Sequence, residues 1–137
     1  MLGRTLLAVT ALAATFAVPA ALPDADAAVR VRDTVALSND DNGHTVSVHS
    51  GDRIDVHLVA VRTDSEKWSW DVPAASSPEV LHRDEGHTTP DGDAVARFTA
   101  TGDGTSSITA HRHCRVTRPG HLCSHLVRTW KVTVNVS

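Results

Sequence analysis

The sequence lacks the signatures of common enzyme classes. It has no Gly-x-Ser-x-Gly run, which would place a serine nucleophile on a strand-to-helix turn. The glycine-containing stretch 101–107 does not end in the Gly-Lys-Ser/Thr of a phosphate-binding loop. Both cysteines lie within residues 114–123, so neither resembles a lone catalytic nucleophile. These absences predict a protein that is not an enzyme and uses no cofactor.

Long helical and long apolar segments are missing after residue 27. No segment there shows an apolar stripe of helical period, and none is apolar enough to span a bilayer. In residues 1–27 one arginine precedes an apolar run that ends at Ala25-Asp26-Ala27, as in a secretory signal peptide. We therefore expect a signal peptide at 1–27, a single domain at 28–137, and a secreted protein without a membrane partner.

Acidic residues are missing from the C-terminal quarter. The formal net charge is −3, which gives no reason to expect a nucleic-acid partner. No Asp or Glu occurs in residues 104–137, whereas residues 64–93 are rich in both. If these segments meet at one end of the fold, they form a polarised surface; ordinary solvated faces are the alternative.

Alternating apolar and polar residues predict β-strands. The clearest segments are 44–49, 53–59, 95–100 and 129–136, while 76–83 is a short strand or a loop. Six to eight short strands in about a hundred residues predict an immunoglobulin-like antiparallel β-sandwich, with a small barrel as the alternative. The side chains expected in its core are Val46, Val48, Ile54, Val56, Leu58, Ala96, Phe98, Ala100, Trp130, Val132, Val134 and Val136.

Residues 111–125 combine four histidines with both cysteines. His111 and His113 would share one face of a strand, and zinc accepts histidine and cysteine ligands. In an oxidising compartment, however, an even pair of cysteines forms a disulfide, and oxidised sulfur supplies no thiolate. We therefore predict a Cys114–Cys123 disulfide in a basic hairpin and no metal. Metal binding through the two histidines is the alternative.

The disulfide also constrains the pairing of the hairpin strands. Closing so short a loop is expected to stabilise the fold by about 2.5–3 kcal/mol. Direct opposition of the cysteines would put Ala110 on the same face as Val127, whereas the core pattern requires Trp130 there. One extra residue, a β-bulge between Ser124 and Trp130, would reconcile the two.

The region from about Thr34 to Val136 carries a recurring frame, made of Gly51-Asp52, Trp70, Phe98, Gly104 and a closing strand. In this order the motifs resemble the chagasin family of secreted or vesicular inhibitors of papain-like cysteine proteases. The resemblance implies an immunoglobulin-like sandwich with three loops at one end. These loops block the protease cleft sterically and are not cleaved.

The three loops differ in sequence from the family pattern. Residues 63–67 stand where the family has Asn-Pro-Thr-Thr-Gly, residues 88–94 contain one glycine, and Arg118-Pro119 is followed by glycine where the family has tryptophan. The protease-contact residues that the resemblance implies are Thr63, Asp64, Ser65, Glu66, Lys67, Trp68, Thr89, Pro90, Asp91, Gly92, Arg118, Pro119 and Gly120.

The leading hypothesis is thus a secreted, monomeric inhibitor whose partner is a papain-like cysteine protease. One alternative is a non-inhibitory extracellular module that binds another partner through the same end of the sandwich. The other is the metal-binding hairpin.

Overall fold

The computed structural model describes residues 31–123 and 127–137. The expected signal peptide at 1–27, and Ser124 and His125 of the hairpin, lie outside these described residues. Residues Val31–Ser137 form one compact unit. Within the described ranges, no helix has the length and apolar character needed to cross a membrane.

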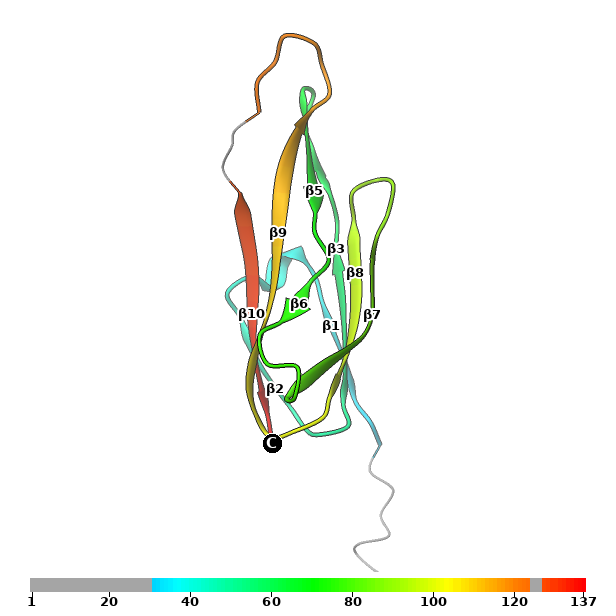
Figure 1. Cartoon of the computed structure of the whole chain (residues 1–137), viewed down its shortest axis with the longest axis vertical. Helices are drawn as coiled ribbons and strands as arrows, with labels where there is room; N and C mark the ends of the chain where they lie inside the picture. The colour runs from blue at the N-terminus through cyan, green and yellow to red at the C-terminus, as the bar shows by residue number, and fades with distance from the viewer. Residues whose placement is uncertain (1–30, 124–126) are drawn as a thin grey trace, which may run out of the picture. The chain divides into compact units, whose positions relative to one another are not determined.

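Two β-sheets form the domain (Figure 1). The first has the order β1-β3-β8-β7, and the second the order β2-β10-β9-β5-β4, with β6 also paired to β9. The first sheet comprises β1 (Thr34–Leu37), β3 (Arg53–Leu58), β8 (Ala94–Ala100) and β7 (Leu81–Thr88). The second comprises β2 (Thr45–Val48), β10 (Arg128–Val136), β9 (Gly104–Val116), β5 (Glu66–Trp70), β4 (Val61–Arg62) and β6 (Ala74–Ala75).

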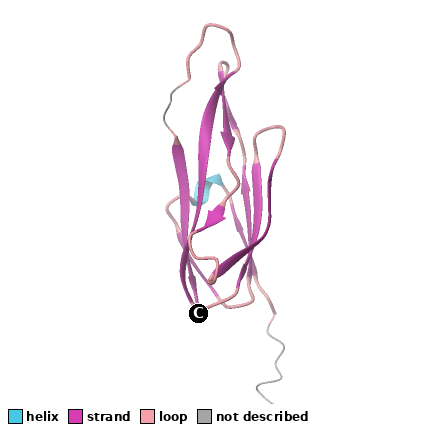
Figure 2. Ribbon diagram, in the orientation of Figure 1, coloured by secondary structure: helices cyan, strands magenta, loops and turns pink. Residues whose placement is uncertain are grey.

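The predicted all-β sandwich is confirmed, and the barrel alternative is wrong because the strands form two separate sheets (Figure 2). The described residues hold ten strands rather than six to eight, since β4 and β6 have only two residues each. The segment 76–83 is both loop and strand, because β7 begins at Leu81.

The core lies between the sheets and follows the predicted alternation. Strand β10 buries every second residue from Trp130 to Val136, and β8 does so from Ala94 to Ala100. Val46 is only partly buried, and Trp70, Ile108 and Ala110 complete the core from β5 and β9. Each of these strands buries one face, and packing of the buried side chains from both sheets holds the sandwich together.

Two strand pairs are parallel, unlike the antiparallel pairing expected throughout. Strand β1 runs parallel to β3, and β2 runs parallel to β10. The reason is the connection between β1 and β2, which passes from one sheet to the other through the 3-10 turn η2 (Asn39–Asp41). The Trp130 indole N–H anchors this connection with a 3.0 Å hydrogen bond to the Ser38 carbonyl.

The predicted single-residue bulge between Ser124 and Trp130 falls partly on residues 124–126, which lie outside the described residues, and the described strand from Arg128 contains no bulge. Strands β9 and β10 pair without a register shift from Arg112–Arg128 to the end of β10. Ala110 therefore lies opposite Trp130, three residues beyond the Val127 that direct opposition of the cysteines requires. An offset of an odd number of residues places Trp130 on the core face, and the predicted bulge of one residue would have had the same effect.

Candidate functional site

Three connections between strands lie at the same end of the sandwich (Figure 1). They are the β4–β5 turn at 63–65, the β7–β8 loop at 89–93 and the β9–β10 connection, described over 117–123 and at 127. The sequence placed its contact residues in these three regions. Glu66, Lys67 and Trp68 were expected in the first loop. They lie in strand β5 instead, because they pair with β9.

The second connection is bonded to strand β5, which follows the first connection. The Lys67 ammonium donates a 3.2 Å hydrogen bond to the Pro90 carbonyl, and the Trp70 N–H donates a 2.9 Å bond to the Gly92 carbonyl. Gly92 has φ +92°, and a Cβ there would lie 2.5 Å from Ser69 Oγ. Only glycine suits this position, since it combines a left-handed conformation with a close approach to β5.

Asp93 organises the second connection from within. Its carboxylate accepts a 2.7 Å hydrogen bond from the Ala60 N–H, and lies 3.5 Å from the His57 ring. The Thr89 N–H donates a 2.9 Å bond to the Asp93 carbonyl, and the Asp93 N–H donates to Thr89 Oγ1 at 3.2 Å. These bonds close the turn formed by Thr89, Pro90, Asp91 and Gly92. Asp93 joins this turn to β3 and to the segment between β3 and β4.

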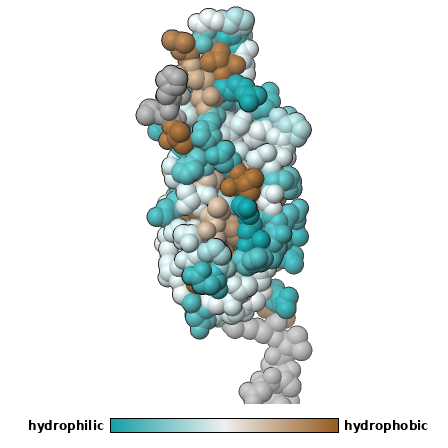
Figure 3. Space-filling view, viewed as in Figure 1, coloured by the Kyte–Doolittle hydropathy of each residue, from teal (hydrophilic) through white to brown (hydrophobic). Residues whose placement is uncertain are grey.

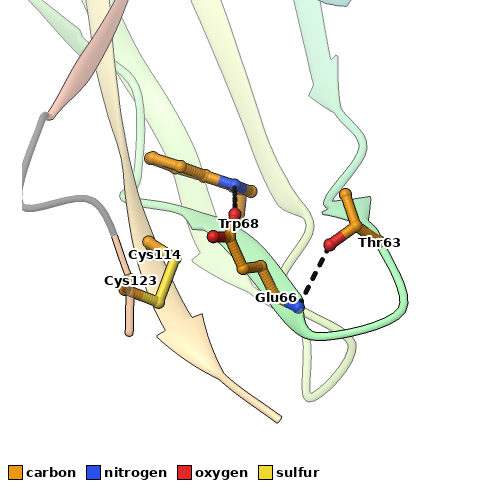
Figure 4. The surroundings of a disulfide bond; sticks show 5 residues. All are labelled: Thr63, Glu66, Trp68, Cys114 and Cys123. Carbon is orange, nitrogen blue, oxygen red and sulfur yellow. Dashed lines mark hydrogen bonds between the residues drawn. A yellow bond between two sulfur atoms is a disulfide. The ribbon is translucent and has the colours of Figure 1, made fainter. Parts of the chain in front are cut away.

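The first and third connections are also joined. The Thr117 N–H donates a 3.0 Å hydrogen bond to the Ser65 carbonyl, which extends the pairing of β5 with β9 into the loops. Within the first turn, Thr63 Oγ1 accepts a 3.1 Å bond from the Glu66 N–H (Figure 4). Asp64 stands at the tip of this turn. The three connections thus form one hydrogen-bonded unit instead of three independent loops.

The predicted Cys114–Cys123 disulfide is confirmed, with the two Cα atoms 5.7 Å apart (Figure 4). Cys114 lies on β9 opposite Trp68, so the bond ties the third connection to the middle of the site. Arg118, Pro119 and Gly120 are all exposed beyond it. Cross-linking reduces the conformational freedom of such a loop.

Leu122 is an exposed apolar residue that the sequence reasoning did not select. Its side chain is 91% exposed, directly beside Cys123. Val127, on the far side of the connection, is also exposed. Figure 3 shows hydrophobic side chains gathered at this end of the molecule. The sequence did contain a sign of this residue, because a leucine stands beside a disulfide cysteine in a mainly polar hairpin.

Trp68 is only partly exposed, because other side chains cover it. Its indole N–H donates a 3.1 Å hydrogen bond to a Glu66 carboxylate oxygen (Figure 4). The Arg112 guanidinium stacks on its ring, 5.3 Å from the ring centroid. Trp68 is therefore mainly a packing residue, which leaves less aromatic surface for a partner.

His111 and His113 point from β9 into separate contacts. The His113 ring lies 2.8 Å from an Asp71 carboxylate oxygen, and the His111 ring lies 3.1 Å from Thr129 Oγ1. Asp71 follows β5, so this contact joins the acidic middle segment to the basic C-terminal one. In the described part of the chain, no three His, Cys, Asp or Glu residues cluster as metal ligands would. The geometry therefore offers no support for the metal alternative.

No known protein family and no curated protein matches this sequence. Among solved structures, the cysteine protease inhibitor EhICP2 from Entamoeba histolytica is similar, with a TM-score of 0.54 and 12% identity over 79% of this chain and 99% of that chain. This chain shares the fold of EhICP2. The resemblance to chagasin-type inhibitors is thus confirmed at the level of the fold.

PixA, a further similar structure, limits what this likeness implies. The inclusion body protein PixA from Burkholderia cenocepacia also has a TM-score of 0.54, at 6% identity over 80% of this chain and 99% of that chain. PbICP-C, solved in complex with falcipain-2, has a TM-score of 0.42 at 14% identity over 78% of this chain and 93% of that chain, which is too low to support an argument. The shared architecture is therefore not tied to one function.

Proposed function

We propose that this chain inhibits papain-like cysteine proteases by inserting the three joined connections into the active-site cleft. The observation that carries the proposal is that the three connections are joined, directly or through strand β5, at one end of a fold shared with EhICP2. A surface that is already ordered loses little conformational entropy when it binds. The proposed inhibitor therefore blocks the cleft as a preformed wedge.

The third connection supplies the most prominent contacts of this wedge. Arg118 and Pro119 are exposed there, and Leu122 offers an apolar side chain that is 91% exposed. Large side chains that become buried at the centre of an interface dominate its binding energy. Leu122 would thus provide the apolar anchor in a hairpin whose Arg-Pro is followed by Gly120 rather than tryptophan.

A second candidate is a non-inhibitory binding module that uses the same end. PixA has the same TM-score as EhICP2, so the fold alone favours neither function. Asp64 of the first connection and Glu66 at the start of β5 also stand where the inhibitor family has uncharged residues. A partner with a basic surface would suit these carboxylates.

We further propose that the protein is exported and acts outside the cell as a monomer. The support is the order of residues 1–27, with a charged start, an apolar middle and a small-residue end. Mass spectrometry of the secreted protein tests this, and an N-terminus at Ala28 is expected. A retained Met1 in the cell fraction would contradict it.

The experiment that tests inhibition is a titration of papain and of a cathepsin-L-like protease with the protein. Reductant is kept low, because the disulfide must survive while the protease thiol stays active. Nanomolar inhibition is expected. No inhibition of either enzyme up to about 50 µM, a binding free energy weaker than about −6 kcal/mol, would overturn the proposal. Binding to either protease without loss of activity would favour the non-inhibitory module.

A further inference from the structure

We propose that a groove beside Arg112 and Arg128 binds the carboxylate of a small organic acid. The groove lies on the inner face of the second sheet, where β5, β9 and β10 run beside the turn η2. Val127 of the third connection also lines the groove, but the two arginines belong to strands β9 and β10. The inference therefore does not depend on the proposed inhibition.

The strand register places the two arginines on the core-facing side of the sheet. Arg112 lies opposite Trp70 of β5 on one side and opposite Arg128 of β10 on the other. Trp70 is buried, and the next inward pair along β9 and β10 is Ala110 with Trp130, also buried. Paired residues in a sheet point to the same face. The arginines therefore continue the row of core residues beyond the end of the apolar core.

Arg112 is held by its aromatic neighbours rather than by a carboxylate. Its guanidinium carbon lies 5.3 Å from the Trp68 ring centroid and 5.6 Å from that of Trp70. Stacking on ring faces leaves the N–H groups at the edge of the guanidinium plane as donors. Its Nε is buried and has no hydrogen-bond partner among the described residues. A buried donor without a partner is unfavourable, so a rearrangement that brings an acceptor to it would be stabilising.

The two arginines have no negative charge to balance them locally. Like charges placed directly opposite each other across a strand pair repel. Within residues 31–123 and 127–137, neither Arg112 nor Arg128 forms an ion pair with Asp or Glu. No acidic side chain lines the groove, and residues 104–137 contain none. An anion between the arginines would remove this repulsion.

The groove has the size and walls for a small organic acid. Its volume is about 460 Å³. The Asn42 side-chain oxygen accepts a 2.9 Å bond from the Lys131 N–H, which leaves its amide NH₂ as a further donor. Trp70 and Trp130 also line the groove, but both are buried, so polar groups dominate its surface. A guanidinium pairs with a planar carboxylate through two parallel hydrogen bonds.

The chain carries its own reporter for a binding test. Its three tryptophans are Trp68, Trp70 and Trp130, and it has no tyrosine. Two of these tryptophans line the groove and the third stacks on Arg112. We would titrate the protein with N-acetyl-leucine at constant ionic strength and follow tryptophan fluorescence. N-acetyl-leucine amide, which lacks only the carboxylate, is the matched ligand control.

Variants then assign the response to the two arginines. Arg112→Gln and Arg128→Gln are each expected to weaken binding by about tenfold, because each removes a charge-assisted donor. Lys131→Gln removes the same charge from β10 on the opposite face, and should bind like the unmodified protein. Arg128 is exposed, so its variant should fold even if Arg112→Gln does not.

Saturable binding of the acid but not of the amide, lost in the arginine variants, would establish the site. No saturable response up to about 50 mM acid, well beyond the affinity of a weak specific site, would overturn it. Equal binding of the amide, or an equal loss in Lys131→Gln, would also overturn it. Inorganic phosphate is the last probe, and binding of phosphate without binding of the acid would exclude the carboxylate class.

Discussion

The backbone N–H of Trp70 donates a 2.9 Å hydrogen bond to the carbonyl of Gly92. Trp70 ends strand β5 of the second sheet, whereas Gly92 lies in the connection between β7 and β8 of the first sheet. One bond therefore joins the two sheets at the end of the sandwich that carries the candidate site. It also fixes the second connection against the end of strand β5.

Replacing Gly92 with alanine should loosen this junction. The φ of +92° is unfavourable for alanine, and the new methyl group would lie 2.5 Å from Ser69 Oγ. We expect the free energy of unfolding to fall by about 2–3 kcal/mol in urea denaturation. Gly43→Ala is the matched control, because φ is +81° there and nothing lies within 4 Å of the added carbon. Equal losses in both variants would show that the close approach at Gly92 is unimportant.

Removing the disulfide should lower stability without changing the core. The Cys114–Cys123 bond closes a loop with a sequence separation of 9. The Cys114→Ser, Cys123→Ser double variant is therefore expected to lose about 2.5 kcal/mol of unfolding free energy in the chain-entropy model. A phosphine reductant should produce the same loss in the unmodified protein and none in the double variant. An unchanged urea midpoint after reduction would contradict the prediction.

Leu122 should matter for binding and not for folding. Its side chain is 91% exposed, so Leu122→Asp removes no core contact. Protease inhibition is expected to weaken by at least about tenfold if this residue is the apolar anchor. Val31→Asp, at a residue 79% exposed and remote from the three connections, is the control and should inhibit normally. The idea fails if both variants inhibit equally well.

Arg118 should contribute to the same interface through its charge. The side chain is exposed, and the turn around it is kept by the 3.4 Å bond from the His121 N–H to the Arg118 carbonyl. Arg118→Ala is therefore expected to weaken inhibition by about tenfold while the urea midpoint stays unchanged. Arg53→Ala, at the end of β3 away from the connections, controls for the lost charge. If Arg118→Ala inhibits as well as the unmodified protein, the other two connections must make the main contacts with the protease.

Asp52 should be among the most sensitive positions outside the apolar core. It is 4% exposed and accepts hydrogen bonds from the Asp33 N–H at 3.1 Å and the His49 N–H at 2.8 Å. Asp52→Ala leaves both donors without this acceptor, so a loss of about 2–4 kcal/mol is expected in urea denaturation. Asp55→Ala breaks only the half-exposed ion pair with Arg97 and should cost under about 1 kcal/mol. Similar losses in both would refute this ranking.

The strands and the core were predictable from the sequence because their signal is local. Phe98 and Trp130 each stand in a run where every second residue is apolar, and such a run can bury only one face of a strand. The disulfide was predictable for a similar reason, since both cysteines belong to one short hairpin. The end of the sandwich that carries the three connections followed from a frame that resembles chagasin-type inhibitors.

The register beyond the hairpin was not predictable, because it depends on which strands become neighbours. Strand β9 extends past the end of its ladder with β10, and its other edge pairs with β5, which places Cys114 opposite Trp68. The same pairing turns residues 66–68 from loop into strand. No local pattern in either segment specifies the other.

The sequence by itself determined the strand periodicity, the buried faces and the covalent closure of the hairpin, because each depends on residues close together in the chain. Only the tertiary structure decided that Gly92 bonds to Trp70 and that Arg112 faces inward between two indoles beside Arg128. These contacts join segments far apart in the sequence, and they exist only after the two sheets have packed. The candidate site and the groove are both made of such contacts.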